Sequence, residues 1–310
     1  MSTAKSWKLC YPIPLVNVCN VPSSNSEGPG NALMLIMRFF LTLTIFLLGS
    51  GPSFFCPVAL NAAESGWKLV WQDEFNGDAL DYSKWGVEVN ALGGGNNELQ
   101  FYTDRPENVR VDNGQLILEA RKDKFSTLGI TRDYSSARIR TKHRGEWKYA
   151  RIEVKAKLPQ GRGLLPAIWM LPTDQKYGGW AASGEIDIAE VLGHKTAVVH
   201  GTLHYGGKWP KNKQSGDHYQ LATGNFADDF HLFALEWDEG EIRWYVDGEH
   251  YQTQKAWFSD KSPFPSPFDQ RFHLILNLAV GGNWPGQPDK KTAFPARMLV
   301  EYVRVYQRIP

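Results

Sequence analysis

Three acidic residues lie close together in the segment Gly184–Glu190, which reads Gly-Glu-Ile-Asp-Ile-Ala-Glu. The small and β-branched residues between them favour a strand. Because side chains two positions apart on a strand point to the same face, Glu185 and Asp187 share one face. Glu190 would point to the other face unless one extra residue near Ala189, a β-bulge, restores the alternation. The pattern therefore predicts a bulged strand that brings three acids together.

The chemistry of such a cluster follows from its charge. Three like charges at this spacing repel one another, so at least one acid is expected to keep its proton near neutral pH. A carboxylate beside a carboxylic acid is the pair that glycoside hydrolysis needs. A solvated strand face and a calcium site are the two alternatives. A calcium loop normally places Gly, Asn and Asp in a turn, whereas isoleucines alternate with acids in this segment. The pattern favours a sugar-cleaving site.

The composition limits the classes of partner. The chain has 310 residues, is 42% hydrophobic and carries a formal net charge of +1 without a basic run, which argues against a nucleic-acid partner. Of the 12 tryptophans, only Trp7 precedes residue 60. Stacked aromatic side chains bind the apolar faces of sugar rings, although about half of the tryptophans are expected in the core. All three cysteines lie in the first 56 residues, so nothing after Cys56 can form a disulfide.

Residues 1–63 are expected to be a leader. A basic residue after Met37, an apolar run and then small residues are typical of a secretory signal peptide. The run is too short to be a convincing membrane span. We hypothesise that translation starts at Met34 or Met37 and that cleavage occurs near Ala62 or Ala63. The mature protein is then expected to be secreted, either extracellular or periplasmic, without a membrane segment.

From Trp67 onward the sequence predicts short strands and turns. Most of the expected strands alternate apolar and polar residues and have Gly, Asp, Asn or Pro nearby, and clear examples are Gln115–Glu119, Ala137–Thr141, Ala150–Ala156 and Glu241–Val246. Asn113-Gly114 and Asp247-Gly248 are hairpin turn signals, because these residues adopt positive φ angles. No amphipathic helix, repeat or linker is visible. The spacing predicts an all-β fold, an antiparallel two-sheet β-sandwich, with residues 64–310 as a single catalytic domain.

Six separated segments of the chain form a recognisable series. They are Leu69–Gly77, Gly95–Thr103, Leu165–Pro172, the acidic strand, His200–Gly206 and Asn277–Gly286. In this order they resemble glycoside hydrolase family 16, and in particular its laminarinase-like endo-β-1,3-glucanases. The resemblance covers residues 67–307. It implies a jelly roll of the concanavalin A-like kind, with a concave substrate cleft, that hydrolyses its substrate with retention of configuration.

The resemblance also implies roles for the acids: Glu185 is the nucleophile, Glu190 the general acid/base, and Asp187 the carboxylate that tunes them. A retaining mechanism requires two carboxyl groups roughly 5–5.5 Å apart, which neighbouring positions on one strand face can supply. Within the family, the bulged Glu-x-Asp-x-x-Glu form marks laminarinases, agarases and carrageenases. The segment Gly95–Gln100 resembles the laminarinase version. The expected substrate is β-1,3-glucan, with mixed β-1,3-1,4-glucan as a secondary one.

Three other functions are alternatives on the same fold. One is a relative that acts on another polysaccharide, as agarases and carrageenases do. The second is a transglycosylase, which passes the sugar of the same covalent intermediate to another chain. The third is a non-catalytic glucan-binding protein, although such relatives typically lose one or both glutamates and this chain keeps them.

Three tryptophans are candidates for stacking on sugar rings. Trp169 lies on the strand that precedes the acidic one, and Trp180 lies just ahead of the acidic strand. For each, a place in the core is the alternative. Trp284 stands in the loop Gly-Gly-Asn-Trp-Pro-Gly, which favours a ligand role because such a loop is a poor place to bury a tryptophan.

Polar candidates complete the expected site. His204 is expected to reach the acid/base glutamate or the leaving-group sugar, whereas His200 is expected to be a hydrogen-bonded core residue. Asn97, Arg138 and Asn277 are expected to form hydrogen bonds with sugar hydroxyl groups. For Arg138, an ion pair with a surface acid is the alternative.

The resemblance leaves a structural calcium open. Relatives often carry one on the convex side, and Glu74 and Gly114 match its expected positions. Glu301 stands where the family prefers Asp. A longer carboxylate still reaches oxygen-ligand distances in many calcium sites. Catalysis itself is expected to need no metal or organic cofactor, and the protein is expected to be a monomer with a β-glucan as its partner.

Overall fold

The computed structural model describes residues 66–127 and 129–309, which belong to one compact unit. The expected leader and its cleavage point lie outside these residues. The described part of the chain contains twenty strands and a short 3-10 turn, η2 (Gly93–Gly95). Within the same ranges, no helix has the length and apolar character needed to cross a membrane.

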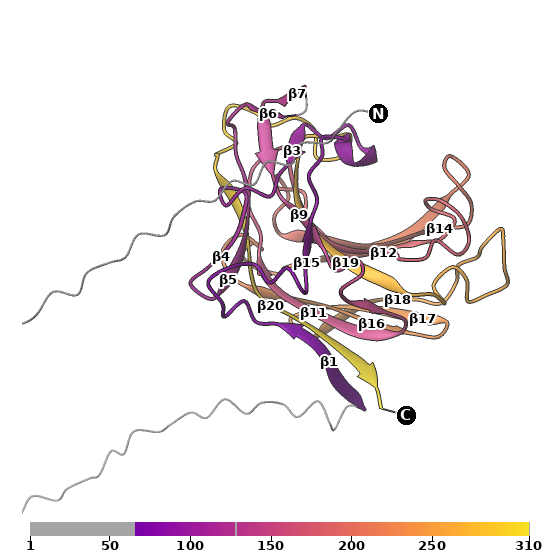
Figure 1. Cartoon of the computed structure of the whole chain (residues 1–310). Coiled ribbons are helices and arrows are strands. Elements are labelled where there is room, and N and C mark those ends of the chain that lie inside the picture. The colour runs from indigo at the N-terminus through magenta and orange to yellow at the C-terminus, as the bar shows by residue number, and fades with distance from the viewer. Residues whose placement is uncertain (1–65, 128, 310) are drawn as a thin grey trace, which may run out of the picture. The chain divides into compact units, whose positions relative to one another are not determined.

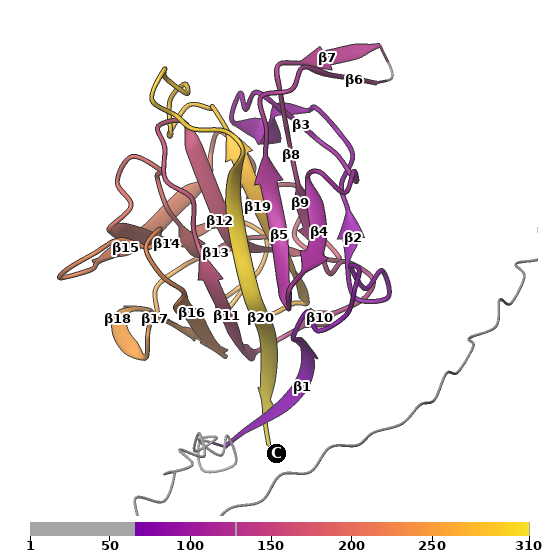
Figure 2. The same cartoon turned by 90° about the vertical axis from the view of Figure 1, so that its left-hand side faces the viewer.

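One eight-stranded sheet, which we name the β20 sheet, has the order β18-β17-β16-β11-β20-β5-β4, and β1 also pairs with β20. Figure 2 shows the long strand β20 between β11 and β5 in this sheet. Its strands are β1 (Trp67–Asp73), β4 (Val109–Asp112), β5 (Gln115–Ala120), β11 (Ala150–Lys157), β16 (His231–Asp238), β17 (Glu241–Val246), β18 (Glu249–Gln254) and β20 (Ala296–Arg308).

The second eight-stranded sheet, which we name the β13 sheet, has the order β15-β14-β13-β12-β19-β9-β2, and β10 also pairs with β19. In Figure 1 the two sheets form an upper and a lower layer. Its strands are β2 (Gly86–Val87), β9 (Arg138–Arg140), β10 (Glu146–Trp147), β12 (Leu164–Pro172), β13 (Glu185–Glu190), β14 (Val198–Tyr205), β15 (Lys213–Gln220) and β19 (Phe272–Val280).

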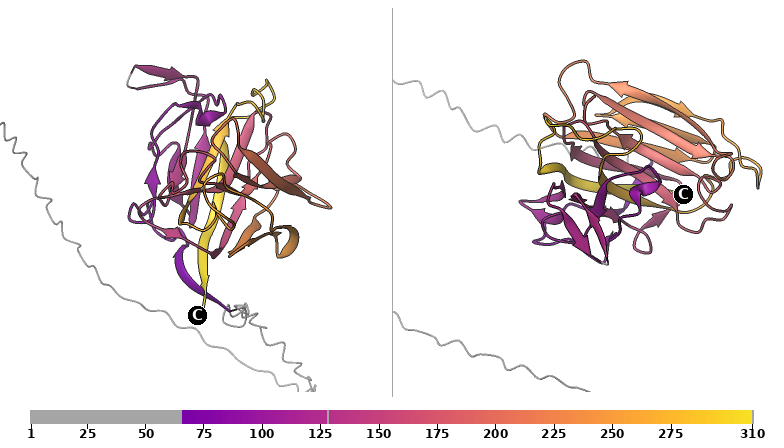
Figure 3. Two further views of the ribbon diagram at one scale, coloured as in Figure 1. Left: turned by 90° about the vertical axis from the view of Figure 1, so that its right-hand side faces the viewer. Right: turned by 90° about the horizontal axis from the view of Figure 1, so that it is seen from above.

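Both large sheets are antiparallel throughout, which confirms the predicted all-β sandwich. Two small pairs accompany them. β3 (Gln100–Tyr102) pairs in parallel with β8 (Tyr134–Ser136), and β6 (Phe125–Thr127) forms a hairpin with β7 (Ile130–Arg132). Figures 2 and 3 show that this hairpin projects beyond the sheets.

The hydrophobic core lies between the two sheets. On β11, buried and half-exposed residues alternate along the whole strand, so Ile152 and Val154 face the core while Arg151 faces outward. Ile168 and Ile186 reach the same core from the β13 sheet. Each such aliphatic side chain stabilises the fold by about 1.5–3 kcal/mol when fully buried. We name the opposite side of β12, β13 and β14, which does not contact this core, the open face.

Both predicted hairpin turns are confirmed. Asn113 and Gly114 have φ angles of 52° and 73°, and the residues on either side of them pair directly. Asp247 and Gly248 have φ angles of 51° and 85° between paired flanking residues. Two consecutive residues with positive φ define the tight turn whose twist matches that of the adjoining strands.

Candidate active site

The predicted bulge is present in β13. Ile168 and Trp169, which are consecutive on β12, pair with Ala189 and Asp187, so Ile188 has no partner on that side. The register with β14 shifts at the same place. Ile188 and Ala189 are both buried in the core although they are neighbours in sequence. As a result, the third acid returns to the open face that the first two occupy.

The bulged strand is tied to the opposite sheet by Trp244 of β17. Its indole Nε1 donates a hydrogen bond to the backbone carbonyl oxygen of Asp187 over 2.8 Å, and the ring is fully buried. A bulge disrupts the ladder locally, so a donor from elsewhere is valuable there. Trp244 lies 57 residues further along the chain, and no local pattern in the sequence predicts this contact.

Two side chains contact Glu185 on the open face. The indole Nε1 of Trp180 donates a hydrogen bond to Glu185 Oε2 over 2.8 Å. The Nε2 atom of His204 lies 3.7 Å from Glu185 Oε1 and 3.2 Å from Asp187 Oδ2. Glu185 is therefore oriented from one side by an indole and faces an imidazole on the other.

The acids strongly affect one another's protonation. Burial raises the pKa of Glu185 to about 8, and the charge of Asp187 adds to the rise while His204 and Trp180 oppose it. Burial also raises the pKa of Asp187 to about 8. Burial together with the charges of Asp187 and Glu185 holds the pKa of Glu190 well above its usual range. The cluster consequently carries fewer than three negative charges at neutral pH, as the spacing predicts.

The two histidines of β14 lie beside different acids. On this strand half-exposed residues alternate with buried ones, so both histidines lie on the open face. His204 pairs with Glu185 in the register, and its Nε2 atom lies near Glu185 and Asp187. Its expected contact with Glu190 or the leaving-group sugar stays a prediction. His200 pairs with Glu190, and its ring lies 5.1 Å from that of Trp284. The expected core position of His200 is wrong, because alternation along β14 puts His200 on the same face as His204, away from the core.

Residues 96–304 match the family model described as "Glycosyl hydrolases family 16". The chain belongs to this family. It is 45% identical over 262 residues to "Glucan endo-1,3-beta-glucosidase A1" of Niallia circulans, a match that covers 79% of this chain and 38% of that protein. It is 46% identical over 250 residues to "Beta-glucanase" of Rhodothermus marinus, covering 78% and 85%.

Among solved structures, the catalytic domain of an endo-1,3-beta-glucanase (laminarinase) from Thermotoga petrophila RKU-1 is similar, with a TM-score of 0.71 and 43% identity. The match covers 79% of this chain and 99% of that domain. The family expected from the six motifs is therefore confirmed, and with it the assignment to glycoside hydrolases.

In this family 16 chain, three of the sequence candidates form one cluster on the open face. Trp169 is half-buried, and its Nε1 donates a hydrogen bond to Asn277 Oδ1 over 2.6 Å. The guanidinium carbon of Arg138 lies 4.6 Å from the centre of the Trp169 ring, and Arg138 Nε lies 3.4 Å from Glu88 Oε2. The ion pair that was the alternative for Arg138 is present. Asn277 is buried and holds Trp169 in place.

The other candidates lie on loops beside the open face. Trp180 and Trp284 are 42% and 41% exposed, which leaves part of each ring free for a ligand. Asn97 Nδ2 donates a hydrogen bond to Asn283 Oδ1 over 3.0 Å. Asn97 therefore joins the glycine-rich segment around η2 to the loop that carries Trp284.

The expected calcium residues lie along the β20 sheet, but their carboxylates already have cationic partners. Both oxygens of Glu74 accept hydrogen bonds from Arg304, each over 2.8 Å. Glu301 Oε2 lies 2.9 Å from the Nζ atom of Lys155. Gly114 occupies the turn between β4 and β5. In this arrangement the side chains do not fit a cation.

A second group has atoms close enough to hold a metal. Ligand atoms of Glu185, Asp187 and His204 all lie within 4.8 Å of one another. Glu185 and Asp187 belong to the acid cluster of β13, and His204 lies beside it on β14.

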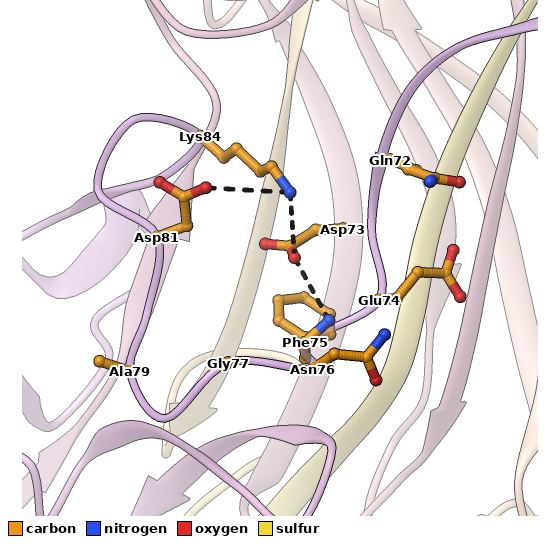
Figure 4. A pocket seen from close by; sticks show the side chains of 9 residues that line it. All are labelled: Gln72, Asp73, Glu74, Phe75, Asn76, Gly77, Ala79, Asp81 and Lys84. Carbon is orange, nitrogen blue, oxygen red and sulfur yellow. Dashed lines mark hydrogen bonds and ion pairs between the residues drawn. The ribbon is translucent and has the colours of Figure 1, made fainter.

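A hollow of about 310 Å³ lies at the end of β1, and none of the acids of β13 lines it. Figure 4 shows the side chains around it. Lys84 lies between two acids in it, with its Nζ atom 3.3 Å from Asp73 Oδ1 and 3.8 Å from Asp81 Oδ2. These contacts pair the ammonium group of Lys84 with two carboxylates of the loop. The hollow belongs to the β20 sheet, so it is separate from the candidate active site.

Proposed function

We propose that this family 16 chain is a secreted endo-hydrolase that cleaves β-1,3-glucan with retention of configuration. The observation that carries the proposal is the group of Glu185, Asp187 and Glu190 on the open face, with Trp180 and His204 beside it. The names of the relatives support β-1,3-glucan, as does the bulged form of the motif. Mixed β-1,3-1,4-glucan is a secondary substrate in this proposal. Secretion rests on the signal-peptide pattern before residue 64.

In the first step, an oxygen of Glu185 attacks the anomeric carbon while Glu190 donates its proton to the leaving glycosidic oxygen. The bond from the anomeric carbon to that oxygen breaks, and a covalent glycosyl-enzyme forms. The hydrogen bond from Trp180 leaves the other carboxylate oxygen of Glu185 free to attack. The raised pKa of Glu190 keeps the proton available at neutral pH.

In the second step, Glu190 takes a proton from a water molecule that attacks the same carbon, and the carboxylate of Glu185 leaves. Once Glu185 is esterified, its negative charge is gone. Since that charge had helped to raise the pKa of Glu190, the pKa now falls and Glu190 can serve as the base. Asp187 lies between the two residues and near His204, where it tunes both steps.

Hydrolysis of a polysaccharide panel tests the proposal. We expect internal cleavage of laminarin, slower cleavage of lichenan and barley glucan, and no cleavage of agarose, carrageenan or xyloglucan. Reducing-end release and product size report the linkage, and proton NMR of the first product reports the anomer. Faster release of reducing ends from agarose than from laminarin would overturn the linkage. Binding of laminarin without cleavage would indicate a glucan-recognition protein.

The same assay with an added oligosaccharide acceptor separates hydrolysis from transfer. Both reactions share the covalent intermediate and differ in what attacks it. Products longer than the starting chain as the main outcome would identify a transglycosylase.

A further inference from the structure

The loop between β14 and β15 carries an exposed tryptophan whose ring the fold does not use. Trp209 is 71% exposed, whereas buried tryptophans such as Trp237 and Trp244 are fully enclosed. Among the described residues, no aromatic ring, cation or hydrogen-bond acceptor contacts the Trp209 indole. Single exposed apolar residues are common on protein surfaces, so exposure alone does not indicate a function.

The loop is braced, so the ring is presented from a fixed support. The backbone N–H of Lys211 donates to the carbonyl oxygen of Lys208 over 2.8 Å, which closes a turn around Trp209. Gly206 forms a bridge to Ser259, and the N–H of Asp260 donates to the Gly206 carbonyl oxygen over 3.1 Å. These two contacts attach the loop to the neighbouring segment 255–262. A rigid aromatic surface loses little entropy when a ligand binds to it.

The loop is also continuous with the catalytic group. The backbone N–H of Trp209 donates to the backbone carbonyl oxygen of Trp180 over 3.3 Å. Trp180 is itself 42% exposed, and its indole donates to the carboxylate of Glu185. Two exposed tryptophans thus follow one another from the acid cluster towards the β14–β15 edge of the open face.

We propose that Trp209 forms a sugar-binding subsite at the β14–β15 end of the open face, where its ring stacks on a glucosyl unit beyond the one that contacts Trp180. The proposal rests on the proposed function, because it takes the ligand to be the β-1,3-glucan chain that Glu185 and Glu190 cleave. A pyranose ring offers an apolar C–H face of a size that an indole covers, and burying both surfaces provides the affinity.

A chain-length series tests the subsite. We compare the wild type with Trp209→Ala, Trp209→Phe and a control, Tyr82→Ala, on β-1,3-linked gluco-oligosaccharides of increasing length. Tyr82 is 58% exposed and lies on the loop between β1 and β2, and β2 is the edge strand of the β13 sheet opposite β15. In Trp209→Ala the backbone N–H to Trp180 remains, so the variant removes only the ring.

We expect Trp209→Ala to raise KM about tenfold for chains long enough to reach the loop, since one stacked ring is worth about one order of magnitude in affinity. The shortest cleaved chains and kcat at saturation should be unchanged. Trp209→Phe should restore most of the loss, and Tyr82→Ala should match the wild type at every length.

The outcomes separate the two proposals. A wild type that does not cleave β-1,3-glucan overturns the proposed function and, with it, the sugar assigned to Trp209. A wild type that cleaves β-1,3-glucan, combined with a Trp209→Ala variant whose KM is unchanged at all lengths, overturns the subsite alone. An equal fall in kcat at every length would show that the ring supports Trp180 and does not bind a distant sugar.

Discussion

Glu185 and Glu190 have the same side chain but different surroundings, and the difference assigns their tasks. Glu185 accepts a hydrogen bond from Trp180 and lies beside His204, and both interactions favour its charged form. Glu190 has acidic neighbours, which favour its protonated form. A nucleophile needs charge and a general acid needs a proton. The indole donor therefore suits Glu185 to the first role, which it fills in its ionised fraction because burial raises its pKa to about 8.

Chemical rescue with azide checks these roles. Glu185→Ala and Glu190→Ala should each lower kcat by about a hundredfold or more, because each removes a group that acts on the reacting atoms. Azide should then yield a β-glucosyl azide from Glu190→Ala, since attack on the covalent intermediate needs Glu185 but no general base. NMR of the product identifies the anomer.

The same product should not arise from Glu185→Ala, which cannot form the intermediate. Circular dichroism provides the control that both variants are folded. A β-azide from the Glu185 variant, or near-normal activity of either variant, would contradict the assignment.

Asp187 is expected to set the position of the pH–rate profile. Its charge contributes to the raised pKa of both Glu185 and Glu190. Asp187→Asn removes that charge, so the pKa values of Glu185 and Glu190 should both fall. We expect a bell-shaped profile of kcat/KM against pH whose acidic and alkaline limbs both move to lower pH in this variant, with a loss of rate. Because the acids interact, the limbs report the cluster and not single residues. Unmoved limbs would mean that Asp187 holds its proton throughout this range.

At the scale of the element, the bulge and its support from the other sheet decide whether β13 can present three acids. The bulge turns two consecutive residues into the core, and Trp244 of β17 donates to the carbonyl oxygen of Asp187. An unpaired buried carbonyl group costs about 1–3 kcal/mol. The hydrogen bond therefore stabilises the fold and keeps the catalytic strand in place.

Two matched tryptophan variants separate these effects. Trp237 is also fully buried, and its Nε1 donates to the carbonyl oxygen of Phe268 over 3.0 Å, away from β13. Trp244→Phe and Trp237→Phe should each lower the free energy of unfolding by about 1–3 kcal/mol or more. Only Trp244→Phe should also lower kcat in the folded protein. Urea unfolding and kinetics at low temperature measure both, and an equal effect on kcat would argue against the specific link.

The sequence predicts those parts of the site that depend on local spacing. The acid positions require a bulge, and Asn113-Gly114 requires positive φ angles, so both follow from neighbouring residues. The partners of Arg138 and the position of His200 depend on how strands far apart in sequence align. Which acid His204 faces depends on the register between β13 and β14, and no local pattern contains that information.

For the molecule as a whole, the acid cluster makes stability depend on pH. The folded-state pKa of Glu190 lies above its ordinary value, so the contribution of this residue is fully present below that ordinary value and is lost as pH rises through the folded pKa. Glu190→Gln should therefore be more stable than the wild type at pH 8, by about 1 kcal/mol or more, because one pKa unit is worth about 1.4 kcal/mol. The difference should vanish near pH 4.

Glu119 provides a control of the opposite sign. Burial raises its pKa, but hydrogen bonds and charge from Arg110 and Arg297 outweigh burial and hold the pKa below its usual range. Glu119→Gln should therefore destabilise the protein at neutral pH, and the loss should shrink as pH falls through the folded pKa. Thermal unfolding at several pH values measures both variants. A Glu190→Gln variant that is less stable than the wild type at pH 8 would refute the sign.

The acids stand on a strand paired on both sides within the β13 sheet, whereas Trp180, Trp209 and Trp284 stand on loops. Loops tolerate substitution and insertion far better than a packed strand does. Evolution can thus change which polysaccharide fits without rebuilding the groups that break the bond. In this architecture the loops can change in sequence and length while the strand that carries the acids is kept.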